Sequence, residues 1–257
     1  MAKHSGLVLE LVKREFSGRY RGSSAGILWA FLQPLFLLSV YTLAFGVILQ
    51  TRWGGMGSTA EFAFLLFSGL IVFNAFSECL QRAPNLVLAH PNFVKKIVFP
   101  LEILSWVMTI TVLLHALIGT GVWLLGYLLF FGFPGPTIVC FPLILAALTP
   151  LLVGMGWLLS AFGVVLRDIR QATGLVSHTL LFLTPIFYSI ESAPKTLQPL
   201  LWINPLTFLV EQYRSVLFHH KWPDFPGLLL YGMAAQAFAF LALRLFRKLQ
   251  PGFADML

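Results

Sequence analysis

The sequence predicts an all-α polytopic membrane protein with six transmembrane helices and with both termini in the cytoplasm. Hydrophobic residues make up 58% of the 257 positions and charged residues only 11%, which leaves too little polar surface to cover a water-soluble globule. Long windows of the chain also lack Asp, Glu, Lys and Arg, as a helix requires in order to cross about 30 Å of hydrocarbon. We therefore expect residues 1–257 to form a single transmembrane domain with lipid as its solvent.

The six spans are predicted from these uncharged windows, because roughly 20 residues of helix cross a bilayer. The longest window is too long for one crossing, and a turn-forming segment from Phe131 to Pro136 divides it into two spans. In chain order the windows are Gly22 to Thr51, Phe62 to Ser77, the two parts of Ile103 to Leu166, Gln171 to Ile190, and Phe225 to Leu243.

The distribution of basic residues orients the spans. With six spans the connecting segments alternate between two sides, and one side holds 13 of the 17 Lys and Arg residues. The other side holds only Arg52, Lys195, Arg214 and Lys221. The excess of positive charge on the cytoplasmic side of membrane proteins places both termini in the cytoplasm. We interpret the net charge of +7 in the same way, and not as a surface for nucleic acid.

The segment before the first span, residues 1–28, predicts an amphipathic helix that lies along the cytoplasmic surface. Between Leu7 and Arg21 the polar residues gather on one sector of a helix and the apolar residues surround the rest. Glu15 and Arg19 interrupt the apolar side at a spacing of four, so they can pair with each other. We interpret this helix as a surface anchor in preference to a ligand site.

A periplasmic re-entrant region is predicted over residues 189–227, between the fifth and sixth spans. The uncharged run from Thr196 to Val210 is too short to cross the membrane and is interrupted at Asn204-Pro205. Irregular backbone at membrane depth is tolerated only where protein or a water-filled cavity surrounds it. A partly buried external loop is an equally good interpretation of the same residues.

The loop after the second span, residues 80–102, contains regular helix breaks. Prolines lie at positions 84, 91 and 100, and Lys95 and Lys96 lie between the last two. Such spacing predicts short helical pieces that begin and end at prolines. A short helix fixed at both ends can dock into a groove of a partner protein. An ordinary basic loop is the alternative.

The sequence predicts no catalytic residue, no metal site and no cofactor bound by this chain. It lacks the G-x-x-x-x-G-K-[ST] phosphate loop, the H-E-x-x-H pattern and the C-x-x-C pattern. Cys79 and Cys140 are predicted at opposite faces of the bilayer, too far apart for a disulfide, and so remain free thiols. His115 and His178 lie inside spans, where we expect neutral imidazoles that hydrogen-bond to neighbouring helices.

Four groups of residues, in order along nearly the whole chain, carry a family resemblance. They are Tyr20 to Gly26 with Trp29 and Pro34; Asn85 to Glu102 with Lys95-Lys96 and Phe99-Pro100; Arg167-Asp168-Ile169; and Pro185 to Tyr188 with Asn204-Pro205 and Tyr213-Arg214. With them the chain resembles the permease subunits of ABC-2-type exporters, which move lipid-linked O-antigen, capsular polysaccharide or teichoic acid. Each group alone is a weak signal for this family, whereas the occurrence of all four in the same order is specific for it.

The resemblance implies a location in the bacterial inner membrane and an assembly of two copies of this chain with two copies of a separate ABC ATPase subunit. That partner would bind ATP and Mg, while this chain would contact membrane lipids and a lipid-linked polysaccharide and no nucleic acid. The resemblance also implies an ATPase-coupling surface. Its residues are Asn85, His90, Asn92, Lys95, Lys96, Arg167 and Asp168. For Arg167 and Asp168, a role at a helix end is favoured over contact with the partner.

The resemblance further implies that the first and fifth spans of two protomers line a channel, with the re-entrant segment near its periplasmic mouth. Sugar rings present apolar C–H faces that stack on aromatic rings. The candidate lining residues are Phe31, Tyr41, Phe182, Phe187, Tyr188 and Trp202. Core packing or anchoring at the membrane interface is the alternative for each. A permease for a drug or a small lipid, and a stand-alone channel or secondary carrier, are the alternative functions.

Overall fold

The computed structural model of the protein describes residues 5–48, 58–91, 93, 99–166 and 168–256. Helix accounts for 83% of the structure and this part of the chain contains no strand, so the all-α prediction is confirmed. Five helical stretches are long and apolar enough to cross a membrane. They are Gly26–Ala44, Thr59–Asn85, Ile103–Phe131, Pro136–Val165 and Phe225–Gly252.

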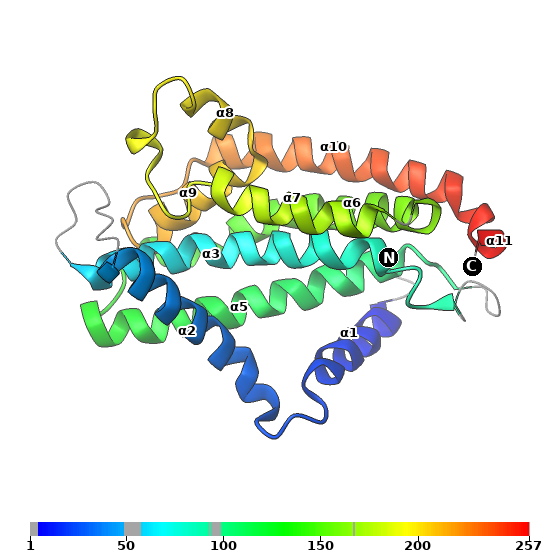
Figure 1. Cartoon of the computed structure of the whole chain (residues 1–257), viewed down its shortest axis with the longest axis horizontal. Coiled ribbons are helices and arrows are strands. Elements are labelled where there is room, and N and C mark those ends of the chain that lie inside the picture. The colour runs from blue at the N-terminus through cyan, green and yellow to red at the C-terminus, as the bar shows by residue number, and fades with distance from the viewer. Residues whose placement is uncertain (1–4, 49–57, 92, 94–98, 167, 257) are drawn as a thin grey trace.

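Four long helices, α3, α5, α6 and α10, run side by side along the molecule, and α2 splays away from them (Figure 1). The start of α1 and the end of α11 lie toward the same end of this bundle (Figure 1). The helix bounds are α1 Ser5–Tyr20, α2 Trp29–Tyr41, α3 Thr59–Arg82, α5 Ile103–Phe131, α6 Phe141–Val165, α7 Ile169–Leu183, α8 Gln198–Ile203, α9 Pro205–Leu217, α10 Phe225–Leu249 and α11 Phe253–Met256. Three short 3₁₀ turns adjoin these helices: η2 Gly26–Leu28 precedes α2, η4 Ala83–Asn85 follows α3, and η5 Pro136–Cys140 precedes α6.

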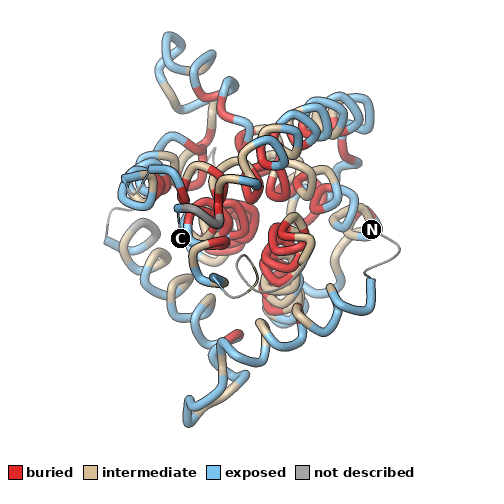
Figure 2. Tube along the Cα trace, turned by 90° about the vertical axis from the view of Figure 1, so that its right-hand side faces the viewer, coloured by how far each residue is buried: buried red, intermediate tan, exposed pale blue. Residues whose placement is uncertain are grey.

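Helix α3 is the centre of the bundle. It contacts α5, α6, α7 and α9, and the buried residues gather on the central helices (Figure 2). The Ser58 side chain caps its start by accepting a hydrogen bond from the Glu61 amide at 3.2 Å, as expected for a serine before a helix. On the α5 side, the Trp123 indole N–H donates to the Phe64 carbonyl at 2.8 Å. The stretch from Phe62 to Phe73 is buried on all sides and, apart from Ser68, consists of apolar residues and a glycine, as suits this central position.

Small residues bring α6 close to its neighbours. A Cβ atom added to Gly154 would lie 2.9 Å from the Ala239 Cα of α10, closer than real Cβ contacts allow. Small residues let helix backbones approach in this way inside membranes. Cys79 is buried and Cys140 half-buried, and both are free thiols as predicted.

The predicted fifth span is helical over only part of its length. Helix α7 has 15 residues, which at 1.5 Å per residue is about 22 Å and shorter than the hydrocarbon thickness of about 30 Å. It ends at Leu183 because Pro185 disfavours helical conformation in the residue before it, and Thr184 is extended. The chain between Thr184 and Ser189 is not helical.

The predicted break at Asn204-Pro205 separates α8 from α9. The Asn204 side chain caps α9 by accepting from the Leu206 amide at 2.9 Å, and its amide donates to the Thr184 hydroxyl at 2.8 Å. Helix α9 then packs against α3. Its Tyr213 hydroxyl meets the Thr120 hydroxyl, in the middle of α5, at 2.6 Å.

Arg214 on α9 is 1% exposed and joins three parts of the chain. It donates to the Leu65 carbonyl of α3 at 3.3 Å and to the Pro185 and Ile186 carbonyls after α7, the latter at 2.9 Å. It also pairs with Glu211 at 2.8 Å. A buried guanidinium with this many partners fixes the turn that follows α7.

Candidate functional site

The first candidate surface lies where α3 ends and α5 begins, which we term the coupling end of the bundle. After α3 the η4 turn buries Pro84 against α6, where a Cβ atom added to Gly163 would lie 2.8 Å from the Pro84 carbonyl carbon. Asn85, the next residue, is exposed. The His90 ring donates to the Leu86 carbonyl at 3.0 Å. The base of the loop is thus fixed to α6, and Asn85 faces outward.

The aromatic rings after His90 hold the loop together. The rings of His90 and Phe93 stack with centroids 5.4 Å apart, and those of Phe93 and Phe99 at 4.5 Å. The other predicted residues of this loop, Asn92, Lys95 and Lys96, lie outside the described residues, as does Arg167. Asp168 occupies the position before α7, but its side chain makes no capping hydrogen bond and the residue is exposed.

Four of the six predicted channel residues come together where α7 ends. The Phe187 ring lies 5.5 Å from the Tyr41 ring and 6.0 Å from the Phe182 ring. The Tyr188 hydroxyl donates to the Phe182 carbonyl at 2.9 Å. The end of α7 before Pro185 is what allows Phe182 and Phe187 to meet, since five residues on a straight helix would point about 140° apart.

These aromatic residues differ in exposure. Phe187 is 6% exposed and belongs to the core, whereas Phe182 is 63% exposed. The remaining two predicted residues, Phe31 on α2 and Trp202 on α8, are also exposed. Phe182 is therefore the member of the group that presents a ring to whatever covers α7.

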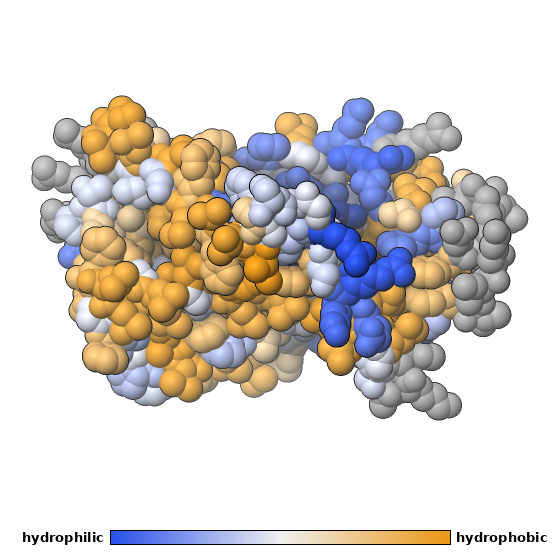
Figure 3. All heavy atoms as spheres, turned by 90° about the horizontal axis from the view of Figure 1, so that it is seen from below, coloured by the Kyte–Doolittle hydropathy of each residue, from blue (hydrophilic) through white to orange (hydrophobic). Residues whose placement is uncertain are grey.

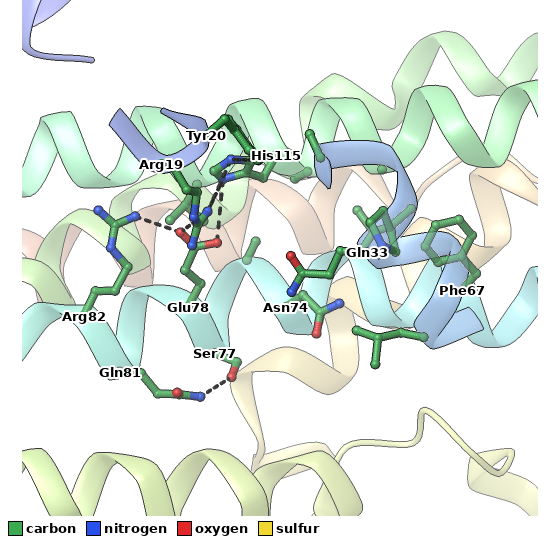
Figure 4. Close-up of a pocket in the computed structure, with 18 residues that line it drawn as sticks. Arg19, Tyr20, Gln33, Phe67, Asn74, Ser77, Glu78, Gln81, Arg82 and His115 are labelled. Carbon is green, nitrogen blue, oxygen red and sulfur yellow. Dashed lines mark hydrogen bonds and ion pairs between the residues drawn. The ribbon is translucent and has the colours of Figure 1, made fainter. Parts of the chain in front are cut away.

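A pocket of about 370 Å³ opens where α1, α2, α3 and α5 meet (Figure 4). Hydrophilic residues gather over the region of α1 at this face of the molecule, while the part of the face away from the coupling end is hydrophobic (Figure 3). We term this cavity the α1–α5 pocket. It contains polar side chains from all four helices, among them Arg19, Gln33, Asn74, Glu78 and His115.

A network of charged residues closes the pocket toward the coupling end. The Glu78 carboxylate accepts from Arg19 at 3.0 Å and from Arg82 at 2.7 Å, and Arg82 also pairs with Glu15. Glu15 and Arg19 were predicted to pair with each other, and this prediction is wrong. The structure gives each of them an oppositely charged partner on α3, because α1 packs along α5 through Val12 and brings its charged residues to α3.

His115 on α5 hydrogen-bonds to the neighbouring helix α1, as predicted. Arg19 donates to its Nδ1 at 2.8 Å. The same Arg19 nitrogen lies 3.2 Å from Nε2 of His115, and the Tyr20 hydroxyl lies 2.9 Å from Nε2. Burial raises the pKa of the Tyr20 hydroxyl, which therefore stays protonated. His178 was predicted to hydrogen-bond to a neighbouring helix, and this prediction is wrong. Its ring donates at 2.7 Å to the Gly174 carbonyl of its own helix.

Uncharged polar side chains form the other part of the pocket wall. Gln33 on α2 and Asn74 on α3 extend toward the pocket (Figure 4) and make no side-chain hydrogen bond within the described part of the chain. Gln81 is different, because its amide donates to the hydroxyls of Ser77 and Ser177 at 3.0 and 3.1 Å. Sequence reasoning passed over Gln33 and Asn74. Their occurrence inside predicted spans was the signal that could have marked them.

The fold and these surfaces define a multi-pass α-helical membrane protein whose polar side chains gather at a pocket and at one end of the bundle. A family model described as ABC-2 type transporter matches residues 6–218, which include the coupling-end loop, the pocket and the aromatic group.

Curated relatives match over nearly the whole chain. The O-antigen export system permease protein RfbA of Myxococcus xanthus is 25% identical over 98% of this chain and 96% of its own length. Two proteins of the same name from Klebsiella pneumoniae are 21% and 22% identical, each over 98% of this chain and 95% of their own length. The chain belongs to the ABC-2 type transporter family. It is the permease, the transport subunit in the inner membrane.

Proposed function

We propose that this chain is the permease of an ATP-driven exporter that moves a lipid-linked polysaccharide, of O-antigen or capsule type, across the inner membrane. The observation that carries the proposal is the match of 98% of the chain to three O-antigen export permeases. The exposed ring of Phe182 beside the Tyr41–Phe187 contact adds a physical reason, because aromatic rings suit the apolar faces of sugars.

In this proposal α7 and the turn after it make the fifth of six crossings, and the segment from α8 to α9 is re-entrant. The contacts of Tyr213 with Thr120 and of Arg214 with Leu65 support this, because they carry α9 into the bundle. The coupling end, which holds Arg82 and the last turn of α10 with Arg247 and Lys248, is then cytoplasmic. Helix α1 lies at the same side as an interfacial helix.

Two copies of the chain enclose the translocation path between their α2 and α7 helices. The span that contains α2 is 0% buried within one chain. Helix α7 leaves the polar residues Gln171, His178 and Thr179 exposed. Polar side chains at membrane depth require a neighbour other than lipid tails, and a channel between two copies provides one. Phe182 and Phe31 then face this channel.

A separate ATPase docks at the coupling end. The buried contact of Pro84 with α6 would transmit its movement to the bundle, while Asn85 and His90 lie at the surface that the partner contacts. The test is a double charge reversal, Lys95→Glu with Lys96→Glu. We expect normal membrane insertion, because 11 basic residues against four still orient the chain, together with loss of ATPase binding and export. Normal ATPase binding by this variant would refute the docking site.

The proposed substrate is tested with the purified permease–ATPase complex in nanodiscs. ATP hydrolysis is measured with lipid-linked glycan extracted from the source cells, with hydrophobic drugs, and with short-chain lipids. The proposal expects stimulation by the glycan fraction. Stimulation by drugs or small lipids alone would support the alternative permease, and transport without any co-purifying ATPase would support a channel or secondary carrier.

The aromatic group is tested by Phe182→Ala, with Phe133→Ala as the control. Phe133 is 94% exposed in the turn between α5 and α6, so the control removes an accessible ring that is not part of the aromatic group. We expect Phe182→Ala to lower glycan-stimulated hydrolysis several-fold at normal stability. Phe187→Ala is a weaker test because Phe187 is buried and its loss creates a cavity. A stability loss for Phe182→Ala with unchanged transport per folded complex would assign this ring to anchoring.

A further inference from the structure

We propose that the α1–α5 pocket is a saccharide-binding subsite, which holds a sugar residue of the glycan through side chains of α1, α2, α3 and α5. This inference rests on the proposed function and adds a recognition site to it. The pocket lies on α2 at a different side from Phe31, because Gln33 and Phe31 are two residues and thus about 200° apart on a helix. None of Tyr41, Phe182, Phe187 and Tyr188 lines the pocket, so it is separate from the aromatic group at the end of α7.

The depth of the unpartnered amides indicates that the pocket is built for a polar occupant. Asn74 is eight residues before the end of α3, which corresponds to about 12 Å of helix. Its neighbours Phe73 and Ala75 are buried at 4% and 3% exposure, while Asn74 itself is exposed and faces the pocket. Gln33 is exposed as well, so both amides are free to hydrogen-bond to an occupant of the pocket. A polar occupant would use both amides, whereas an apolar one would leave them without a partner.

The charge balance of the pocket favours a neutral occupant over an anion. Its lining contains Arg19, Arg82 and Glu78, and Glu15, which lies outside the lining, pairs with Arg82. His115 lies between Arg19 and Glu78, with its Nδ1 2.8 Å from Arg19 and 3.7 Å from Glu78. The four charges cancel, each arginine already has a carboxylate partner, and a phosphate would meet the Glu78 carboxylate. Sugar hydroxyl groups both donate and accept, so they match arginine, amide and carboxylate groups together.

The size and the apolar wall of the pocket agree with a sugar ring. A volume of about 370 Å³ is near the lower limit of small-molecule sites, which begin at about 300 Å³. Apolar surfaces also line the pocket, among them the Tyr20 ring, Pro34, Leu37 and Phe67. Such surfaces contact the C–H faces of a sugar while polar groups fix its hydroxyls. Both requirements of saccharide binding are met in one cavity.

The test uses Asn74→Leu and Gln33→Leu in the permease–ATPase complex in nanodiscs. The probe is the lipid-linked glycan fraction of the source cells, carrying a fluorophore on its sugar chain, and the readout is Kd. Each variant removes one amide and should weaken binding about 3- to 10-fold, as expected for one lost hydrogen bond. Both should fold normally, because neither amide has a partner within the described residues. Gln236→Leu on α10, an exposed amide outside the pocket, is the matched control and should leave Kd unchanged.

The outcomes separate this inference from the function on which it rests. If the wild-type complex binds the glycan and both variants bind it equally well, the pocket assignment is overturned and the proposed function stands. If the wild-type complex binds no lipid-linked glycan, the proposed function fails and the subsite with it. A polyprenyl diphosphate without sugar is the competing probe. If it displaces the glycan fully and its own affinity falls in Asn74→Leu, the pocket binds phosphate and the saccharide assignment is overturned.

Discussion

Helices α2 and α3 lie in two membrane-spanning stretches with the same mean hydropathy of 1.8. Of the 18 residues in each stretch that would cross the membrane, 89% are buried in the stretch that contains α3 and 0% in the stretch that contains α2. Hydropathy therefore places both helices in the membrane without deciding what covers them. Helix α3 is covered by other helices of the same chain. Helix α2 contacts α3 and α5 on one side only and leaves the rest of its surface to lipid or to a second copy of the protein.

The difference arises from how each helix is held. Helix α3 begins with a serine cap and lies among α5, α6, α7 and α9. Helix α2 follows a turn in which Gly22 and Gly26 have φ angles of 90° and 50°, in the left-handed region that glycine adopts readily. It contains Pro34 and continues into a π-helix over Thr42–Ile48. These features direct α2 away from the bundle (Figure 1).

The largest effect is expected at the buried contact between α9 and α3. Arg214→Leu leaves the carbonyls of Leu65, Pro185 and Ile186 without their donor, and we expect a loss of about 3–5 kcal/mol in the free energy of unfolding. Chemical unfolding in detergent measures this loss. Arg244→Leu, on the exposed side of α10 over Phe240, is the control and should cost under about 1 kcal/mol. Equal losses would contradict the special role of α9.

The comparison between α2 and α3 is tested directly by two leucines. Leu66→Ala on α3 removes a side chain that is 0% exposed and should cost about 2–5 kcal/mol. Leu32→Ala on α2 removes one that is 46% exposed and should change the free energy of unfolding by about 0.5 kcal/mol or less. Thermal unfolding of the single chain in detergent compares them. Similar losses for both variants would mean that α2 packs within its own chain.

A glycine substitution tests how the α3 end is fixed to α6. In Gly163→Ala the new methyl group meets the Pro84 backbone, which cannot move as a flexible side chain does, so we expect a loss of about 1–3 kcal/mol. ATP hydrolysis should also respond less to substrate. Gly232→Ala on α10, where nothing lies within 4 Å of the new Cβ, should be neutral or stabilising by up to about 1 kcal/mol. An unchanged Gly163→Ala variant would show that the η4 turn adjusts freely.

The smallest effect on stability is expected on the outer side of α2. Phe36 is 69% exposed, so Phe36→Ala should change the free energy of unfolding by less than about 0.5 kcal/mol. If a second copy covers α2, the same variant should shift the protein from dimer toward monomer, which native mass spectrometry measures. An unshifted dimer would place the subunit contact elsewhere.

Much of the architecture follows from local sequence. Uncharged windows located the helices that cross the membrane, and the break at Asn204-Pro205 separates α8 from α9 as predicted. Glycine and proline act through the backbone of their own segment, so their effects are readable from the chain alone. The order of four motifs was enough to indicate the ABC-2 type family, which the family match establishes.

Tertiary structure decided which side chains meet. Arg19 and Glu78 pair across 59 positions of sequence, Glu15 pairs with Arg82, and the Tyr20 hydroxyl meets His115 on α5. The sequence suggested a local Glu15–Arg19 pair because spacing along one helix is the only geometry that it displays. The pocket, the exposure of α2 and the joining role of Arg214 depend on how separate helices pack. Hydropathy and periodicity place each helix in the membrane, while the distances between helices are set by side chains that are remote in the chain.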